Sequence, residues 1–355
     1  MNKCLALFYF CMLLGCEKNK PINKLHETLS SQSLVYATKF NIQEDHLSVM
    51  EPWPGSKSAI DYTFESIPQR VVVTSTTHLP YLELLGLEDK LVGFVGTNNI
   101  YSEKINGHLK SGKIVELGIN GKINLELLLA SQPDLVIAFD LGGESTTLDK
   151  IVEAGIPIVY NSDFLEETAL GRAEWIKFFG YIFDESKIAD SIFSSMVERY
   201  QYLKSLTQNV TERPSVFSGV VYGDTWFLPG GKNWSAQFIK DAGGTYVWED
   251  NLSSGWLELS FETVLDRARE ARFWIGVASI NTRTELMAQD ARYELFEAYQ
   301  EQRIYNYNKR IGNNGGFDFF ESAYARPDLV LADLIRILHP ELLPNHSTYY
   351  FQKIL

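Results

Sequence analysis

Cysteine is scarce in this 355-residue chain. Its three cysteines all lie within the first 16 residues, and Cys4 and Cys11 belong to an apolar N-terminal run. If that run is removed as a signal, Cys16 is the one cysteine of the mature chain. An internal disulfide, a catalytic thiol and a cysteine-ligated metal are then excluded.

Basic charge and nucleotide-binding motifs are also lacking. The 32 Lys and Arg residues are outnumbered by 45 Asp and Glu residues, giving a formal net charge of -13. That balance argues against a nucleic-acid partner, because such partners are bound largely through basic side chains. The glycines form neither a P-loop, a dinucleotide fingerprint nor a Gly-x-Ser-x-Gly elbow, so we expect no enzyme of those classes.

No hydrophobic run is long enough to span a bilayer. The run from Cys4 to Leu14 follows Lys3 and has the length of a signal-peptide core. Its end, Leu13-Leu14-Gly15-Cys16, resembles a bacterial lipoprotein signal, in which Cys16 would carry the lipid; an ordinary signal peptide with a chance cysteine is the alternative. Residues 17–33 are polar and predict a tether. We therefore expect a membrane-anchored lipoprotein of the periplasm.

The remaining chain predicts an α/β fold of two Rossmann-like lobes with mainly parallel sheets, joined by one long rigid helix. Short apolar strands alternate with helices on both sides of a helical stretch, which is typical of parallel sheets buried on both faces. The expected divisions are an N-terminal lobe at 34–165 with a hairpin at 34–64, a connecting helical region at 166–212, and a C-terminal lobe at 213–355.

The joining helix is predicted from one apolar stripe. Ile188, Ile192, Met196, Tyr200 and Leu203 follow each other at spacings of four, four, four and three. We expect Asp184 to cap the start of this helix, and Arg213-Pro214 to end the helical run. A further strand is expected from Val216 to Tyr222.

Two stretches, residues 124–139 and 259–276, share the same order of features. Each begins with a Glu in the first turn of a short helix, Glu126 or Glu262, and continues through a charged or turn-forming break into an apolar strand. The structural explanation is that a carboxylate is favoured by the helix dipole at that position. The functional one is that each Glu projects from the outer tip of its lobe towards a basic partner.

Ligands of open parallel sheets bind beyond the carboxyl ends of the strands. Those loops are rich in aromatic and polar residues, which suit a bulky, flat or chelate-like ligand, although any one aromatic could instead wedge its loop onto the core. His78 could be a ligand contact or a core histidine, and no second or third metal ligand accompanies it, so any metal should arrive inside a chelate and no cofactor is expected. The candidate ligand-binding residues are Thr76, His78, Thr97, Tyr101, Phe139, Tyr222, Trp226, Trp234, Arg310 and Phe317.

Several motifs together resemble a known family, the two-lobed substrate-binding proteins of ABC importers for iron-siderophore, haem and cobalamin, whose lobes are joined by a rigid helix. The resemblance covers about Arg70 to Pro344. The motifs are Asn124-Leu125-Glu126, Gln132-Pro133-Asp134-Leu135, Trp226-Phe227-Leu228-Pro229-Gly230-Gly231, Asp241-Ala242-Gly243-Gly244, Leu259-Ser260-Phe261-Glu262, Arg326-Pro327-Asp328-Leu329 and His339-Pro340-Glu341-Leu342.

The resemblance implies a monomer that delivers a small-molecule chelate to a permease dimer with its ATPase. It also implies that Glu126 and Glu262 form salt bridges with arginines of the permease. It does not identify the chelate, but Arg310 is the one basic residue near the late cleft loops, which favours a neutral or weakly charged chelate or a corrinoid. Two other functions stay open: a periplasmic chelate-processing enzyme using Asp224, Asp318 or His78, and a structural or sensory lipoprotein that has lost transport.

Overall fold

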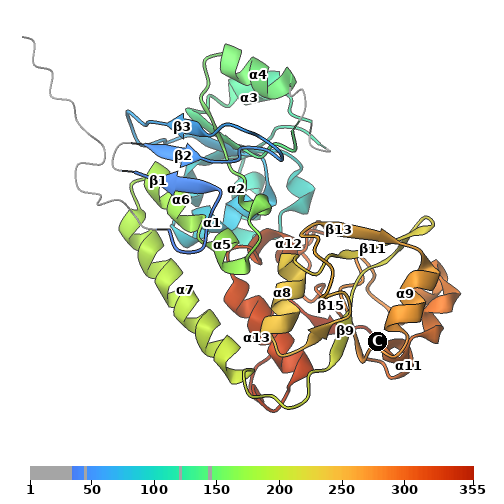
Figure 1. Ribbon diagram of the computed structural model, residues 1–355. Coiled ribbons are helices and arrows are strands. Elements are labelled where there is room, and N and C mark those ends of the chain that lie inside the picture. Colours follow the sequence, from blue (N-terminus) through green and yellow to red (C-terminus); the bar gives the residue numbers. More distant parts are fainter. Residues whose placement is uncertain (1–33, 44–45, 120–121, 143–145) are drawn as a thin grey trace, which may run out of the picture.

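The computed structural model describes residues 34–43, 46–119, 122–142 and 146–355. The predicted signal, Cys16 and the tether lie outside these ranges. The described chain forms two α/β lobes with one long helix running along both, which confirms the predicted fold class (Figure 1). Within the described residues, no helix combines the length and the apolar character needed to cross a membrane.

A parallel five-stranded sheet forms the centre of the N-terminal lobe, in the order β6-β5-β4-β7-β8. Its central strands are apolar throughout because both faces are covered: Val71 and Val73 enter one core cluster and Val72 enters another. The strands are β4 (Val71–Val73), β5 (Leu91–Phe94), β6 (Val115–Glu116), β7 (Leu135–Ala138) and β8 (Ile158–Tyr160).

Short helices follow the strands of this lobe, and a small antiparallel sheet precedes it. The sheet consists of β1 (Phe40–Ile42), β2 (Leu47–Val49) and β3 (Ile60–Tyr62). The helices are η1 (Thr76–His78), α1 (Leu79–Leu84), η2 (Glu88–Lys90), η3 (Thr97–Asn99), α2 (Glu103–Lys110), α3 (Leu125–Ala130), α4 (Thr146–Glu153) and η4 (Asp163–Leu165).

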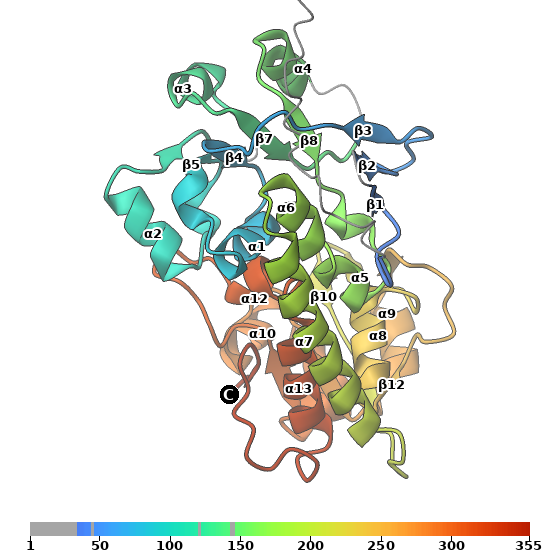
Figure 2. The same cartoon turned by 90° about the vertical axis from the view of Figure 1, so that its left-hand side faces the viewer.

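Three helices make up the region between the lobes: α5 (Ala169–Ala173), α6 (Ile176–Ile182) and α7 (Ser186–Leu206). The aromatic helix α6 is buried in the N-terminal lobe. Helix α7 packs on α6 at one end and on α13 (Pro327–Leu338) at the other (Figure 2). It begins after Glu185, not at an Asp184 cap, because Asp184 has φ +60° and turns the chain between α6 and α7.

A second sheet forms the centre of the C-terminal lobe, in the order β12-β9-β14-β15-β16, parallel except for β16. Phe217, Trp226, Trp274 and Phe296 stack in its core. The strands are β9 (Ser215–Phe217), β12 (Thr245–Tyr246), β14 (Phe273–Ile275), β15 (Ile304–Asn306) and β16 (Gln352–Lys353).

An antiparallel sheet and seven described helices complete this lobe. The sheet is β10 (Val220–Tyr222), β11 (Thr225–Pro229) and β13 (Trp256–Leu259). Besides α13, the helices are α8 (Trp234–Asp241), α9 (Phe261–Ala268), α10 (Arg283–Gln289), η5 (Ala291–Leu295), α11 (Glu297–Gln300) and α12 (Asp318–Ser322).

The strand predicted from Val216 to Tyr222 is two strands in two different sheets. Gly219 separates them with φ +85°, and a Cβ atom at this position would overlap the backbone carbonyl of Phe227. Only glycine accommodates both the left-handed backbone and the close approach of β11. The break redirects the chain from the parallel sheet into the β10–β11 hairpin, which borders the cleft described next.

Candidate functional site

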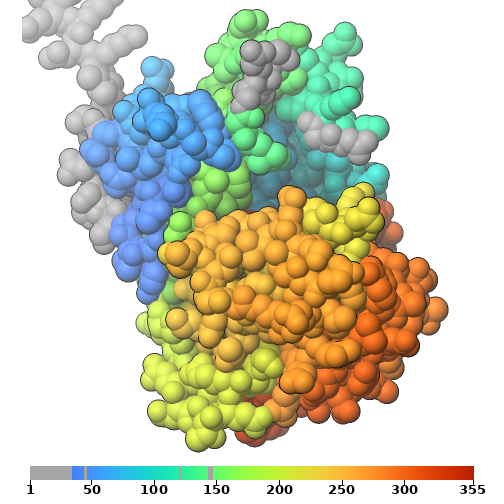
Figure 3. Space-filling view, turned by 45° about the vertical axis from the view of Figure 1, so that its right-hand side comes forward, coloured from blue at the N-terminus to red at the C-terminus, as the bar shows by residue number. Residues whose placement is uncertain are grey.

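Loops at the carboxyl ends of strands from both lobes border a common cavity. Figure 3 shows the two lobes as separate masses that meet across a recess. The loops after β4, β5 and β7 line this cavity from the N-terminal lobe, while Ser279, residues 315–317 and Phe320 line it from the C-terminal lobe. We call it the interlobe chamber, and its volume is about 730 Å³.

Hydroxyl-bearing and aromatic residues both line the interlobe chamber. Hydroxyl groups come from Thr74, Ser75, Thr76, Thr147 and Ser279. The rings come from both lobes: Phe139 follows β7, and Phe317 and Phe320 flank α12 or lie on it. This combination offers hydrogen bonds together with flat apolar contacts, which suits a ligand of mixed polarity.

A second cavity of about 700 Å³ lies mainly in the C-terminal lobe, and we call it the C-lobe chamber. Thr77, Phe164 and Arg172 border it from the N-terminal half of the chain. Tyr222 and Trp256 also line it, and both are largely exposed. Its other aromatic lining residues are Phe227, Trp234, Phe238, Tyr307, Phe319, Phe320, Tyr324 and Phe351.

Phe320 borders both chambers, and it is the one residue that lines both of them among the described residues. The ring is 53% exposed and stacks on Phe317 at a centroid distance of 5.8 Å. Its backbone carbonyl accepts a 3.4 Å hydrogen bond from Thr76 Oγ1 of the other lobe. A ligand that fills both chambers must therefore contact Phe320.

Beside the interlobe chamber, the lobes contact each other through a buried carboxyl group. Glu321 on α12 accepts hydrogen bonds from the backbone N–H groups of Tyr101 (2.7 Å) and Ser102 (3.0 Å). Burial raises the pKa of Glu321 to about 8, with a further contribution from the nearby Glu83, although the two N–H donors act in the opposite direction. The contact holds α12 against the loop that precedes α2.

Arg310 belongs to the same contact. Its Nε donates to Asp318 Oδ2 at 2.5 Å, and its guanidinium lies 5.0 Å from the Tyr101 ring and 4.1 Å from the Tyr349 ring. The side chain is thus engaged with protein groups, and it does not line either of the two chambers. Tyr101 and Arg310 lie together at the contact between the lobes, and neither of them lines a chamber.

Five of the ten candidate ligand residues line the chambers. Thr76, Phe139 and Phe317 lie in the interlobe chamber, and Tyr222 and Trp234 lie in the C-lobe chamber. Thr97 lies next to the interlobe chamber, where its hydroxyl donates to Glu116 at 2.5 Å while its neighbour Gly96 lines the cavity. The rule that ligands bind beyond strand carboxyl ends located these loops.

The predictions for His78 and Trp226 need correction, because both side chains are completely buried away from the chambers. His78 packs near Phe179, and neither of its ring nitrogens has a hydrogen-bond partner among the described residues. Burial lowers the pKa of His78 to about 3, so the ring is neutral. Trp226 stacks on Trp274 in the core and donates its indole N–H to the Ser218 carbonyl at 3.1 Å.

Arg172 is a charged residue at the C-lobe chamber that the sequence pattern did not single out as a ligand contact, and the buried Asp163 lies near it. Arg172 donates to the carbonyls of Phe164 and Glu166 and packs between the rings of Trp234 and Tyr324. Burial raises the pKa of Asp163 to about 7, although the charge of Arg172 acts in the opposite direction. Arg172 was missed because it lies in the connecting region, outside the strand-end loops.

The three candidate catalytic groups lie in different surroundings. Asp224 is exposed in the turn between β10 and β11, Asp318 is paired with Arg310, and His78 is in the core. In the described part of the chain, no three His, Cys, Asp or Glu side chains are grouped so that they could hold a metal ion.

Glu126 and Glu262 occupy equivalent positions in short helices with matching caps. Asn124 accepts the N–H of Leu127 at the start of α3, and Ser260 accepts the N–H of Thr263 at the start of α9. Both glutamates are exposed and lie outside the two chambers. Glu262 forms an ion pair with Arg292 at 3.1 Å, a contact within its own lobe.

Three comparisons with known proteins agree with this architecture. The chain is 24% identical to a lipoprotein of Methanocaldococcus jannaschii over 85% of this chain and 72% of that protein. It is 28% identical to the vitamin B12-binding protein of Vibrio parahaemolyticus over 53% of this chain and 64% of that protein. A periplasmic heme-binding protein of Pseudomonas aeruginosa has a similar structure, with TM-score 0.62 and 18% identity over 81% of this chain and 98% of that one.

The family described as periplasmic binding protein matches residues 71–311, which is more than half of the chain. The match begins at β4 and includes α7 and every strand of the two central sheets except β16, and it ends before the chamber-lining residues 315–317 and Phe320. By sequence and by fold, this chain belongs to the periplasmic binding protein family.

Proposed function

We propose that the protein is the substrate-binding component of an ABC importer and captures a metal chelate between its lobes. The observation that carries the proposal is the interlobe chamber, which both lobes line and whose volume of about 730 Å³ falls in the range of small-molecule sites. The printed names of relatives include a vitamin B12-binding protein and a heme-binding protein. An iron-siderophore, haem or cobalamin is accordingly the proposed class of cargo.

The same proposal covers location and partners. Cys16 would carry a lipid that anchors a monomer at the membrane surface of the periplasm, and a lipoprotein name among the relatives supports this. The exposed Glu126 and Glu262 would contact arginines of a permease dimer that works with an ATPase. Their position outside the chambers supports a role in docking, separate from ligand binding.

Cargo capture without chemical conversion is favoured over chelate processing. Of the groups that could catalyse, Asp318 is neutralised by Arg310 and His78 has no access to either chamber. We therefore propose a binding protein and no enzyme. Incubation of the protein with a bound chelate should return that chelate unchanged, as mass spectrometry of the released ligand would record.

The deciding experiment is identification of the cargo. The protein is purified without denaturation, and its absorbance spectrum and the mass spectrum of the extracted ligand are recorded. The unfolded and refolded protein is then titrated separately with haemin, cyanocobalamin and ferrichrome. We expect one-to-one binding of at least one chelate; no co-purified chelate and no binding in all three titrations would overturn the proposal.

A further inference from the structure

The C-lobe chamber extends from the cleft into the interior of its lobe. Several of its lining residues belong to the hydrophobic core and are only 1 to 3% exposed: Phe238, Ile239, Val330, Leu334 and Phe351. Protein interiors are normally packed with few voids larger than a water molecule. The C-lobe chamber, with a volume of about 700 Å³ and a mouth at the exposed Tyr222 and Trp256, therefore leaves part of this core wall uncovered by other side chains.

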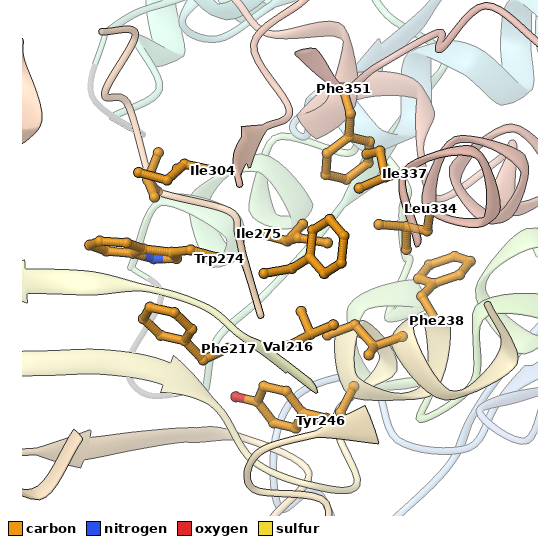
Figure 4. Close-up of a cluster of buried hydrophobic side chains, with 14 of the residues drawn as sticks. Val216, Phe217, Phe238, Tyr246, Trp274, Ile275, Ile304, Leu334, Ile337 and Phe351 are labelled. Carbon is orange, nitrogen blue, oxygen red and sulfur yellow. The ribbon is translucent and has the colours of Figure 1, made fainter. Parts of the chain in front are cut away.

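Three parts of the lobe form the inner wall. Phe238 lies on α8, Leu334 lies on α13, and Ile275 ends strand β14. Figure 4 shows Phe238, Leu334 and Phe351 grouped beside Ile275, all with apolar side chains. The chamber thus lies between two helices and the carboxyl end of the parallel sheet, where the fold places ligands.

The outer wall carries large exposed apolar groups. Tyr222 is 81% exposed and Trp256 is 64% exposed, and they come from the antiparallel sheet at the chamber mouth. Phe320 borders both this chamber and the interlobe chamber. Phe320 therefore lies between the two chambers, and the apolar lining of the C-lobe chamber reaches from the exposed Trp256 to the core of the lobe.

Water is a poor occupant of such a space. Buried water needs two to four polar partners, and apolar cavities remain dry and bind apolar molecules instead. Among the described residues that line the chamber, Arg172 is the one charged side chain, and it is engaged with two carbonyl groups and two aromatic rings. The neutral polar side chains of Thr77, Ser218, Asn233, Ser235 and Ser254 also line the chamber, whereas its inner wall is apolar.

We infer that the C-lobe chamber binds an uncharged apolar group of the cargo. The cargo is then amphiphilic: its polar, chelating part occupies the hydroxyl-rich interlobe chamber, and its apolar part passes Phe320 into the C-lobe chamber. The placement of the chelating part in the interlobe chamber rests on the proposed function. The apolar site rests only on the walls of the C-lobe chamber and can be tested without knowledge of the natural chelate.

The test uses N-phenyl-1-naphthylamine, a neutral apolar dye whose fluorescence rises in an apolar site. The unsubstituted protein, freed of co-purified ligand, should bind one dye molecule. Val330→Phe places a larger side chain in the chamber and should weaken dye binding at least tenfold while the Tm stays level or rises. Val152→Phe makes the same substitution at an exposed position on α4 and should leave dye binding unchanged.

A second chamber variant, Ile239→Phe, is measured in parallel so that a folding defect in one variant does not decide the result. Absence of dye binding by the unsubstituted protein would overturn the inference. So would dye binding that neither chamber variant weakens, because the dye would then occupy another site. Either outcome leaves the chelate titrations with haemin, cyanocobalamin and ferrichrome untouched, so the proposed function is judged separately.

Discussion

His78 is a core residue whose effect on folding stability depends on pH. Burial lowers its pKa from 6.5 to about 3, so the unfolded chain takes up a proton below pH 6.5 that the folded chain refuses. This histidine therefore lowers stability as pH falls from 6.5 towards 3.

We expect His78→Leu to remove that share of the acid sensitivity. We compare the free energy of unfolding of the variant with that of the parent at pH 7 and at pH 5. The difference between them should shift in favour of the variant by about 2 kcal/mol from pH 7 to pH 5, since one pKa unit corresponds to about 1.4 kcal/mol. Urea unfolding at the two pH values measures this. An equal difference between the proteins at pH 5 and pH 7 would contradict the prediction.

Glu321 has the opposite effect on the pH dependence of stability: it lowers stability as the pH rises. Its pKa is raised from 4.5 to about 8, so between these values the folded chain keeps a proton that the unfolded chain releases. Stability should fall as pH rises through this window, because the buried carboxylate at the contact with Tyr101 and Ser102 becomes charged.

The glutamine side chain of the Glu321→Gln variant cannot ionise, so the variant should not lose this stability as the pH rises. Between pH 5 and pH 8 we expect the parent to lose about 2 to 4 kcal/mol more than the variant, as judged from the size of the pKa change. Thermal unfolding monitored by circular dichroism at both pH values provides the measurement. Parallel pH profiles for parent and variant would show that Glu321 titrates normally.

Side-chain identity alone could not separate cleft residues from core residues. Phe139, Tyr222 and Trp234 were predicted in the strand-end loops and do line the chambers, whereas His78 and Trp226 satisfied the same rule and are buried. The difference depends on which neighbours cover each ring, and those neighbours come from α6 for His78 and from β14 and η5 for Trp226.

At the scale of elements, α7 was predicted at nearly its true position but with a shifted buried face. Ala189, Phe193, Met196, Tyr200 and Leu203 are buried, whereas Ile188 is 46% exposed. Spacing identifies a helix of period 3.6, but the partner helices α6 and α13 decide which residues of a wide apolar stripe are covered.

A proline on the exposed side of α7 should test the importance of this helix for both lobes. Ser194 is exposed in the helix interior, and Ser194→Pro removes a backbone hydrogen bond and clashes with the preceding turn. We expect a loss of about 3 kcal/mol or more in the free energy of unfolding.

The control for this variant is Ser194→Ala, which favours the helix and should match or slightly exceed the parent in stability. Both variants are compared by urea unfolding followed through circular dichroism. Because α7 packs on a helix of each lobe, the proline should lower the stability of the whole molecule. Equal unfolding midpoints for the proline and alanine variants would refute a structural role for an unbroken α7.

At the scale of the whole molecule, the glutamates and the chambers are separate. Glu126 and Glu262 lie on α3 and α9, and neither lines a chamber. The double variant Glu126→Ala with Glu262→Ala should therefore keep the ligand affinity of the parent. Uptake of the identified cargo by cells that carry the importer should be lost, because the proposed contact with permease arginines is removed.

The paired measurements are isothermal titration with the cargo and a cellular uptake assay. Arg292→Ala is the matched control, because it breaks the ion pair of Glu262 but keeps both glutamates. That control should retain uptake. Weakened ligand binding in the double variant would move the glutamates into the ligand site, and normal uptake would remove them from docking.

The sequence by itself determined the α/β class, the two lobes, the joining helix and the strand-end loops that carry the ligand candidates. These follow from local hydrophobic periodicity and from the rule that strand carboxyl ends meet at one edge of a sheet. Only the tertiary structure decided that Phe320 lines both chambers, that Arg172 borders one of them, and that the C-lobe chamber reaches the core. Cavities and burial depend on residues distant in the chain coming together, and no local pattern records the space left between them.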